Sequence, residues 1–329
     1  MAMQAVVQSA PGGVDTLRLD VVEKPEPAPG QLRVRVLAAG LNRADIVQRE
    51  GHYPPPKGAS PILGLEVAGI VDAVNGPSRF QEGDAVFGLI AGGGYAEYAL
   101  LDSSAAIPKP DMLSWVEAAS LPEAWMTAWH NLVDVAGLKS GETVLIHAGA
   151  SGVGAAAIQL AAMLGCRVIA SAGSAEKREF CQRLGADMVI DSRSAGFAAS
   201  LKAQGGVDVV LDPVGASLFN DNIAVLKQDG RLVLIGVMGG AQADLNLGLL
   251  LVKRLRVIGS TLRSQPEEVK ASLAAALERE VLPALLDGRA HVTLDSVYPL
   301  AAVQDAHACM EANRNLGKIV LSLLPVMPG

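Results

Sequence analysis

Between residues 143 and 259 short apolar runs alternate with helical patterns, and this alternation constrains the fold more than any other feature of the chain. The runs predicted as strands are 143–147, 167–171, 188–190, 207–211, 231–236 and 255–259. Between the first two, apolar residues at positions 153, 157, 160 and 164 recur every three or four residues and would line one face of a helix. Apolar strands separated by helices indicate a parallel sheet covered on both faces. Six such strands predict an α/β fold of the doubly wound type.

Residues 1 to about 120 have a different texture. The stretch "QLRVRVLAAG" at 31–40 begins with alternating polar and apolar residues, which is the period of a half-buried strand. Turn sequences such as "PAPG" and "NGPS" recur, so short strands in an antiparallel barrel or sandwich are expected. The last part carries two helical patterns and a final strand, "KIVLSL". We expect it to complete the first domain, giving one domain of 1–121 with 265–329 and a second of 122–264.

Composition and charge exclude some classes of protein. Half of the 329 residues are hydrophobic and 19% are charged, which fits packed globular domains and not disorder. The net charge of −7 makes nucleic acid an unexpected partner, since binding phosphates needs a cationic surface. The three cysteines lie far apart and form no CxxC pair, so neither a disulfide framework nor a metal site is expected from them. No secretory signal or membrane span is evident, and we expect a cytoplasmic protein.

The turn after the first apolar strand carries the strongest local chemistry. In "VLIHAGASGVGAAAIQLA" the glycines 149, 152 and 154 punctuate the turn before a helix opens. Glycines allow the backbone to approach a pyrophosphate, and a helix N-terminus offers unpaired N–H groups. The spacing is G-x-x-G-x-G rather than G-x-G-x-x-G. Its position between a strand and a helix, with a second strand about 20 residues on, nevertheless predicts a dinucleotide site.

The tip of the second strand favours NADP(H) over NAD(H). An NAD site usually ends this strand with an acidic residue that binds the ribose 2′-hydroxyl. Here "RVIASAGSAEKREF" places Gly173 and Ser174 at the tip, with Lys177 and Arg178 just beyond. A hydroxyl and cations would accept a 2′-phosphate that a carboxylate would repel.

Together these features resemble the medium-chain dehydrogenase/reductase superfamily, in which a GroES-like β-rich catalytic domain, split between both ends of the chain, flanks a Rossmann domain. Zinc-dependent members carry C-x-x-D and later G-H-E, whose cysteine and histidine bind the metal. Here "NRAD" puts Asn42 at the cysteine position and keeps Asp45, while "GLEVAG" puts Leu65 at the histidine position and keeps Glu66. An amide and an aliphatic group cannot replace a thiolate and an imidazole on zinc, so no metal is expected.

Among zinc-free members the chain is most similar to the NADPH:quinone oxidoreductases, a group that includes zeta-crystallin, and above all to the p53-inducible quinone oxidoreductase. Segments that carry this resemblance are "LNRADIVQREGHYPPP", "SPILGLEVAGIV", "LPEAWMTAW" and "MEANRNLGKIVLSL". The resemblance implies that Asn42, Asp45 and Tyr53 surround the quinone and nicotinamide. The cofactor-binding positions that it and the glycine turn indicate are Thr127, Gly149, Ser151, Gly152, Val153, Gly154, Gly173, Ser174, Lys177, Ser192, Ile235, Gly236 and Met238. Relatives often have a ring at Ser192, so either this contact is weaker here or Arg193 substitutes for it.

Without a Lewis acid, an alcohol or simple ketone is a poor substrate, whereas a quinone accepts hydride readily. Tyr53 and Asn42 would donate hydrogen bonds to the acceptor oxygen, and Asp45 would orient them or belong to a solvent relay. Glu66 has either a catalytic or a structural role, and Arg263 either reaches the site or lies at the surface. His147 is expected to be a packed residue behind the site.

We therefore expect an NADPH-dependent quinone oxidoreductase. Two alternatives remain open: reduction of an activated C=C bond in an enone or enoyl thioester, and a non-enzymatic role in RNA binding or as a structural protein like zeta-crystallin. The resemblance also implies a homodimer or homotetramer. Pairing is expected at the sheet edge formed by residues 231–236 and 255–259, because exposed edge strands need cover.

Overall fold

The structure is a computed structural model that describes residues 1–194 and 196–324. Its chain divides into two compact units, which are described separately. The first comprises Met1–Met126, Arg263–Gly288 and the residues from Val292 on, and the second comprises Thr127–Leu262 and Arg289–His291. The domain limits predicted from the sequence stay a prediction. No helix in the described residues is both long enough and apolar enough to cross a bilayer.

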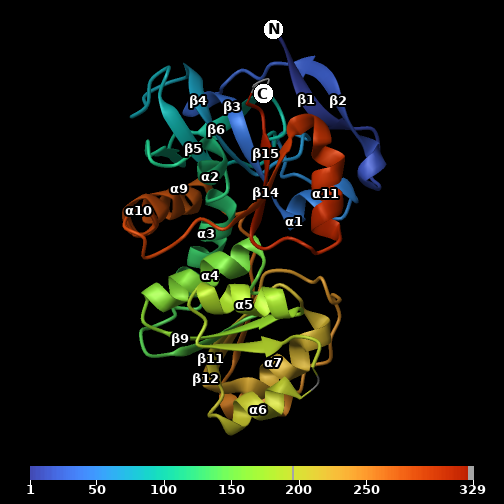
Figure 1. Ribbon diagram of the computed structural model, residues 1–329, viewed down its shortest axis with the longest axis vertical. Helices are drawn as coiled ribbons and strands as arrows, with labels where there is room; N and C mark the ends of the chain where they lie inside the picture. The colour runs from blue at the N-terminus through green and yellow to red at the C-terminus, as the bar shows by residue number, and fades with distance from the viewer. Residues whose placement is uncertain (195, 325–329) are drawn as a thin grey trace. The chain divides into compact units, whose positions relative to one another are not determined.

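The second unit contains a six-stranded sheet in which every pairing is parallel (Figure 1). Its strands are β8 (Thr143–Ile146), β9 (Arg167–Ala172), β10 (Met188–Asp191), β11 (Val207–Asp212), β12 (Leu226–Leu234) and β13 (Arg256–Gly259). They lie in the order β10-β9-β8-β11-β12-β13, which is the 3-2-1-4-5-6 order of a Rossmann sheet. From β8 the strands are added towards one edge of the sheet as β9 and β10, and from β11 towards the other edge as β12 and β13. The carboxyl ends of β8 and β11 therefore form the switch point where such folds bind ligands.

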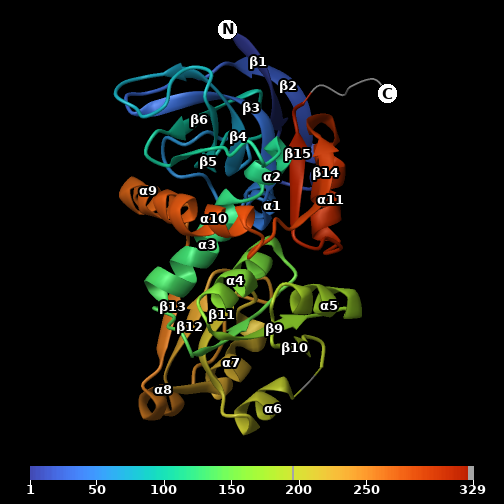
Figure 2. The same ribbon diagram turned by 60° about the vertical axis from the view of Figure 1, so that its left-hand side comes forward.

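Helices cover both faces of this sheet. The helices of this unit are the end of α3 (Pro122–Trp129), which runs on from the first unit, the π-helix η2 (His130–Val135), α4 (Gly152–Met163), α5 (Ala175–Arg183), α6 (Phe197–Ala203), the 3-10 helix η3 (Ala216–Leu218), α7 (Phe219–Val225) and α8 (Leu247–Lys253). Figure 2 shows α4 and α5 on one face and α6 and α7 on the other. All four residues of β8 are buried, as a central strand covered on both faces requires.

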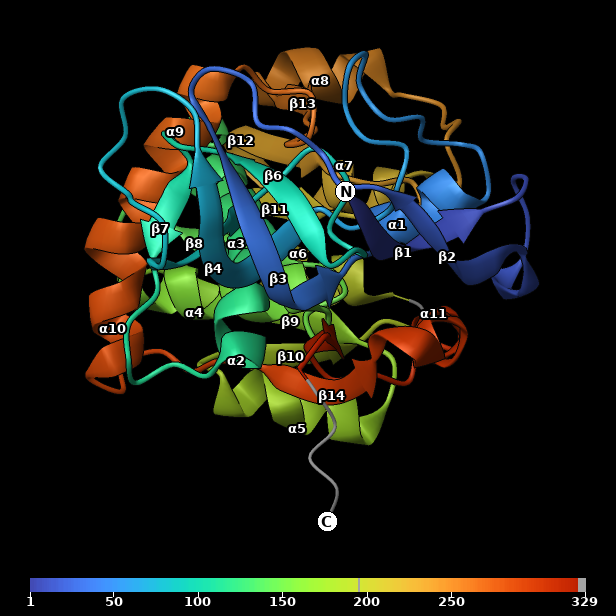
Figure 3. The same cartoon turned by 90° about the horizontal axis from the view of Figure 1, so that it is seen from above.

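The first unit is built on a seven-stranded sheet and a separate hairpin. The hairpin pairs β1 (Ala2–Gln8) with β2 (Leu17–Glu23) in antiparallel fashion. The sheet strands are β3 (Gln31–Leu41), β4 (Glu66–Val74), β5 (Ala85–Leu89), β6 (Tyr98–Asp102), β7 (Ala106–Pro108), β14 (Leu294–Pro299) and β15 (Lys318–Ser322). They follow the order β14-β15-β3-β4-β5-β7, with β6 also paired to β3, and Figure 3 shows β4, β3 and β6 side by side.

The C-terminal part of the chain completes this sheet. Strand β15 pairs antiparallel with β3, Ile319 opposite Leu41, so residues from the two ends of the sequence share one core. The helices of the unit are η1 (Val14–Thr16), α1 (Arg43–Arg49), α2 (Trp115–Ala119), α9 (Glu267–Ala276), the π-helix η4 (Leu277–Val281), α10 (Leu282–Leu286), η5 (Leu300–Ala302) and α11 (Val303–Glu311). The predicted fold class, a β-rich domain beside a doubly wound parallel sheet, is confirmed.

Candidate active site

In the first unit, the polar segment after β3 begins α1 and is held by a buried carboxylate. The backbone N–H of Asn42 donates to Asp45 Oδ2 at 2.8 Å, which closes the first turn of the helix. Asp45 also accepts from Gly64 N at 3.0 Å and from the Tyr95 hydroxyl at 2.9 Å. The side chain has no exposed surface. Burial raises the pKa of Asp45 to about 6, although these three hydrogen bonds oppose the rise. The contacts of Asp45 are those of a group that orients its neighbours.

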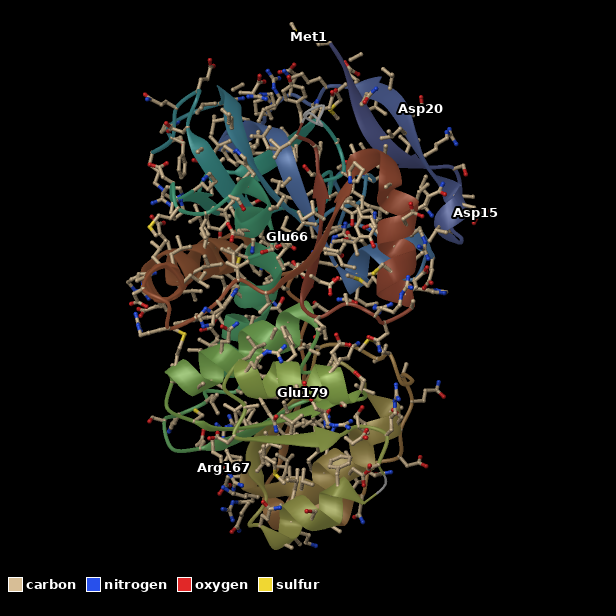
Figure 4. All side chains as sticks on the ribbon, viewed as in Figure 1. Met1, Asp15, Asp20, Glu66, Arg167 and Glu179 are labelled. Carbon is tan, nitrogen blue, oxygen red and sulfur yellow. The ribbon has the colours of Figure 1, made fainter. Side chains whose placement is uncertain are left out.

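A second buried cluster joins Asn42 to Glu66 and Lys318. The Lys318 ammonium lies 2.6 Å from Glu66 Oε1 and donates to Asn42 Oδ1 and to the carbonyl of Leu41. Asn42 Nδ2 donates to the same oxygen of Glu66 at 2.9 Å. Glu66 has no exposed surface, and Figure 4 shows its side chain inside the unit while Asp15 and Asp20 stand at the surface. A buried charge is stable only when it is paired and hydrogen-bonded, and this cluster satisfies both conditions.

The same cluster does not fit a zinc ion. Leu65, at the position where zinc-dependent relatives have histidine, is an apolar core residue. Asn42, at the cysteine position, presents its oxygen to the Lys318 ammonium, and a cation at that point repels a metal. No group of three or more His, Cys, Asp or Glu side chains in the described part of the chain is arranged to hold a metal. That this protein works without a metal stays a prediction.

Arg263 and Tyr53 form a neighbouring pair in the same unit. Arg263 is buried, so of the two alternatives left open for it the surface position is wrong. Its guanidinium donates to Gln48 Oε1 at 2.7 Å and to the carbonyl of Ala91, and it stands 5.5 Å from the centre of the Tyr53 ring. Tyr53 is partly exposed. Burial and the charge of Glu123 raise the pKa of the Tyr53 hydroxyl, while Arg263 lowers it, so the hydroxyl stays a proton-bearing hydrogen-bond donor.

Sequence reasoning did not single out Glu123, which lies in the first turn of α3. Its backbone N–H donates to Glu66 Oε2 at 2.8 Å, so the start of the helix is fastened to the buried cluster. Burial, and then the charge of Glu66, raises the pKa of the Glu123 carboxyl to about 8, with Lys318 and Arg263 opposing. Tyr95 and Lys318 were also missed. The one local signal for Lys318 was a cation at the start of an apolar strand, where it needs a buried partner.

In the second unit, the glycine turn between β8 and α4 has the close approaches that a pyrophosphate cradle needs. A Cβ on Gly154 would meet the carbonyl oxygen of Ala148 at 2.3 Å, and one on Gly149 would meet Cys181 Sγ at 2.9 Å. Ser151 caps the helix by accepting from Gly154 N at 3.0 Å. The next N–H groups, of Gly152 and Val153, have no partner within the helix and are available to an anion. The turn therefore fits a dinucleotide phosphate.

The tip of β9 is basic and carries no acidic side chain. Gly173 follows Ala172, and Ser174 caps α5 by accepting from Lys177 N at 3.2 Å. A Cβ on Gly173 would stand 3.1 Å from Arg193 Nε and 3.4 Å from Ser192 Oγ, so this guanidinium lies over the strand tip. The arrangement fits the 2′-phosphate of NADP(H). That Arg193 replaces the ring which relatives often have at Ser192 stays a prediction.

Three of the other predicted cofactor positions lie in the loop at the carboxyl end of β12, and a fourth, Thr127, lies in α3. Strand β12 ends at Leu234, so Ile235, Gly236 and Met238 follow it and do not belong to it. Ile235 N donates to the Asp212 carbonyl at 2.9 Å, and a Cβ on Gly236 would meet the Pro213 carbonyl at 2.7 Å. The loops that follow β11 and β12 are therefore held together. Thr127, in α3, is buried, and its carbonyl accepts from Asn131.

His147 lies at the switch point but is fully engaged. Its Nδ1 lies 2.8 Å from Ser171 Oγ and its Nε2 2.8 Å from Asn222 Oδ1, while Asn222 Nδ2 donates to Asp212. Burial lowers the pKa of His147, which favours the neutral ring. The ring joins the ends of β8, β9 and β11 behind the glycine turn, as expected of a packed residue.

Comparison with known proteins adds to this geometry. Two families match the chain: "Alcohol dehydrogenase GroES-like domain" over residues 28–111 and "Zinc-binding dehydrogenase" over residues 152–279. Among curated proteins, a component of the phenolphthiocerol/phthiocerol polyketide synthase of Mycobacterium tuberculosis is 34% identical over 329 residues, which cover 95% of this chain. The chain spans only 14% of that much longer protein.

Solved structures similar to the chain have related but different activities. An NAD-dependent alcohol dehydrogenase is 33% identical, with a TM-score of 0.87 over 98% of this chain and 100% of that one. The mycobacterial protein Rv1454c complexed with NADPH is also 33% identical, with a TM-score of 0.87 over 97% and 99%. A mycobacterial quinone oxidoreductase is 32% identical at 0.83 over 97% and 99%, and the CurK enoyl reductase 30% identical at 0.84 over 98% and 99%.

Proposed function

Since the chain belongs to the medium-chain dehydrogenase/reductase superfamily, we propose that it is an NADPH-dependent quinone oxidoreductase that uses no metal ion. The observation that supports the proposal is the buried Lys318–Glu66–Asn42 cluster, in which Asn42, the residue that the resemblance aligns with a cysteine ligand of zinc-dependent relatives, is hydrogen-bonded to an ammonium group. Without a metal to polarise a carbonyl, the substrate itself must be electron-poor. A quinone meets this condition because it becomes aromatic on reduction.

The second unit is the proposed cofactor-binding domain. The residues proposed to hold NADPH are Gly149 and Ser151–Gly154 at the pyrophosphate, Gly173, Ser174, Lys177 and Ser192 with Arg193 at the 2′-phosphate, and Thr127, Ile235, Gly236 and Met238 at the nicotinamide. When bound, NADPH supplies the hydride for the reduction. The absence of a carboxylate at the tip of β9, the Arg193 guanidinium beside it and the likeness to NADPH-bound Rv1454c support NADPH over NADH.

The first unit is the proposed catalytic domain, where Asn42, Asp45 and Tyr53 take separate roles. The Tyr53 hydroxyl donates a hydrogen bond to the acceptor oxygen as negative charge develops there. Asn42 Nδ2 has a second hydrogen that Glu66 does not use, and it is the second proposed donor. Asp45 does not touch the acceptor in this scheme. It holds the first turn of α1 and the Gly64 backbone, and so fixes the direction of the Asn42 amide.

A second candidate function is the reduction of an activated C=C bond in an enone or enoyl thioester. The likeness to the CurK enoyl reductase favours it, and the polyketide synthase relative is compatible with it. Such a reaction needs a proton donor beside the acceptor, and Glu123 is a side chain of the required kind. A non-enzymatic role in RNA binding has less support, because the net charge is −7.

The proposal also covers the relationship of the protein to other quinone oxidoreductases, its location and its assembly. It adds a special closeness to the p53-inducible quinone oxidoreductase, a cytoplasmic location, and assembly as a homodimer or homotetramer. None of them changes the chemistry of the site.

The test is NADPH oxidation by chelator-treated protein with 1,4-benzoquinone or 9,10-phenanthrenequinone, and in parallel with an enone and an enoyl thioester. NADPH-preferring turnover of the quinones that survives chelation supports the main proposal. Turnover of only the enone or thioester moves the function to the second candidate. If the wild type reduces quinones, a Tyr53→Phe variant should lose this activity. Tyr98→Phe, in β6 beside Lys24, serves as the matched control. Loss of activity on chelation, restored by zinc, contradicts the metal-free scheme.

A further inference from the structure

The backbone of Glu123 is held in place by a hydrogen bond, whereas its side-chain carboxyl makes none with the described residues. Its N–H is fastened to Glu66 Oε2, which sets the position of the residue at the start of α3. Among the described residues, no hydrogen-bond donor lies at its carboxyl oxygens, and the residue keeps partial exposure. The other buried acids of the unit differ in this respect. Glu66 accepts from Lys318, Asn42 and Glu123, and Asp45 accepts three hydrogen bonds.

The charges of groups from several elements act on this carboxyl. On the acidic side are Glu66 in β4 and Asp45 in α1, and on the basic side are Lys318 in β15, Arg263 beyond β13 and Lys270 in α9. Tyr53 is the neutral neighbour, and the Glu123 charge raises the pKa of its hydroxyl. Burial is the largest influence on Glu123 itself and raises the pKa of its carboxyl to about 8. At neutral pH the carboxyl therefore carries a proton within electrostatic reach of Tyr53, the proposed hydrogen-bond donor to the acceptor.

We propose that the Glu123 carboxyl supplies the proton that completes the reduction of the acceptor bound at Tyr53. This inference rests on the proposed function. The acceptor takes a hydride from NADPH, leaving NADP⁺, and becomes a hydroquinone monoanion or, for an enone, an enolate. The O–H bond of Glu123 then breaks, a new O–H or C–H bond forms on the product, and the carboxylate recovers its proton from water. Two electrons and two protons are then accounted for.

Other groups of the unit suit this role less well. Asp45 has no exposed surface, and its two oxygens already accept three hydrogen bonds. Lys318 donates to three acceptors inside the cluster, and Arg263 donates to Gln48 and Ala91. The pKa of the Tyr53 hydroxyl is raised, so it gives up a proton less readily than a free tyrosine. Tyr53 is therefore the orienting donor and Glu123 the acid.

The experiment compares wild-type protein with Glu123→Gln, Glu123→Asp and a control, Glu82→Gln, whose side chain is exposed in the turn before β5. Glutamine keeps the size of the side chain and leaves the backbone bond to Glu66 in place, but it has no acidic proton. We expect kcat of Glu123→Gln to fall about 10²-fold at pH 7, since a positioned acid contributes on this scale. Glu123→Asp should recover part of the loss, and Glu82→Gln should match the wild type.

The pH profile separates an acid from a structural residue. Wild-type kcat should fall as pH rises through about 8, because the folded carboxyl then loses its proton, and this fall should be absent from Glu123→Gln. The solvent isotope effect on kcat should shrink in the same variant. If both substrate classes are reduced, the loss should be larger for the enone, whose enolate is the more basic anion.

The two proposals fail in different ways. Full activity of Glu123→Gln with an unchanged pH profile, in a wild-type enzyme that reduces quinones, overturns the role of Glu123 and leaves the proposed function standing. An equal loss in Glu123→Gln and Glu123→Asp, with the wild-type pH profile retained, assigns Glu123 a structural role and also overturns the inference. A wild-type protein that reduces neither quinones nor enones overturns both.

Discussion

At the scale of single residues, Lys318 is the cation that balances Glu66 inside the first unit. Replacing it with methionine keeps the volume but leaves a buried carboxylate without its partner. We expect Lys318→Met to lower the free energy of unfolding by about 3–5 kcal/mol, measured by urea denaturation at pH 7. The double variant with Glu66→Gln should recover part of this loss. The control Arg254→Met removes an exposed partner of Asp229 and should change little. Equal stability of Lys318→Met and wild type would refute the pairing.

Glu123 makes a second prediction at the residue scale, and this one does not depend on activity. Its pKa is about 8 in the folded chain and near 4.5 in an unfolded one. From pH 4.5 to 8 the unfolded chain has therefore lost a proton that the folded chain retains, so rising pH favours unfolding. Removing the carboxyl in Glu123→Gln should leave the variant more stable than the wild type at pH 9, by an amount on the order of a few kcal/mol. This difference should vanish towards pH 4.

The unfolding free energies of both proteins, measured by denaturant titration across this range, give the comparison. Glu82→Gln should track the wild type at every pH. A pH-independent difference between Glu123→Gln and the wild type would mean that the carboxyl is already ionised in the folded chain.

At the scale of elements, the turn from β8 into α4 tests the cofactor site. The Cβ of an alanine at position 154 would stand 2.3 Å from the Ala148 carbonyl oxygen and 2.8 Å from Gly149 Cα, which are backbone atoms that cannot move aside. We expect Gly154→Ala to weaken NADPH binding more than 10-fold, followed by NADPH fluorescence, because the turn must widen. Gly259→Ala is the control, since nothing lies within 4 Å of its Cβ. An unchanged affinity of Gly154→Ala for NADPH would contradict the binding of the cofactor phosphate at this turn.

Some of these structural elements can be predicted from the sequence, and the buried cluster around Glu66 cannot. The six parallel strands and the glycine turn were predictable because each is a local pattern of apolar spacing or of glycine before a helix. The buried cluster was not. Its hydrogen bonds join Asn42 to Glu66 across 24 residues, Glu66 to Glu123 across 57 and Lys318 to Leu41 across 277. Only the pairing of β15 with β3 brings Lys318 to Asn42. The residues next to Glu123 in the sequence do not indicate that the pKa of its carboxyl is raised.

At the scale of the whole molecule, the open edge of the parallel sheet predicts self-association. Strand β13 is the last strand on its side of the sheet, and in α8 the side chains of Leu251 and Val252 are 75% and 76% exposed. An uncovered edge beside exposed apolar side chains needs a partner. We expect sedimentation velocity to show a dimer or a higher even-numbered assembly at micromolar concentration. Leu251→Glu with Val252→Lys should shift it towards monomer without unfolding it. A monomeric wild type would contradict this expectation.

The pairing of β3 with β15 also bears on how the chain is made. A ribosome synthesises β3 and β4 long before it reaches β15, and until then residues 38–41 of β3 lack their β15 partners and the carboxylate of Glu66 lacks its cation. The parallel sheet, whose strands all lie between residues 143 and 259, is complete much earlier. During translation the second unit can therefore fold while the first one waits for its final strand. A nascent chain halted before residue 318 should resist protease in its middle and remain sensitive near its start.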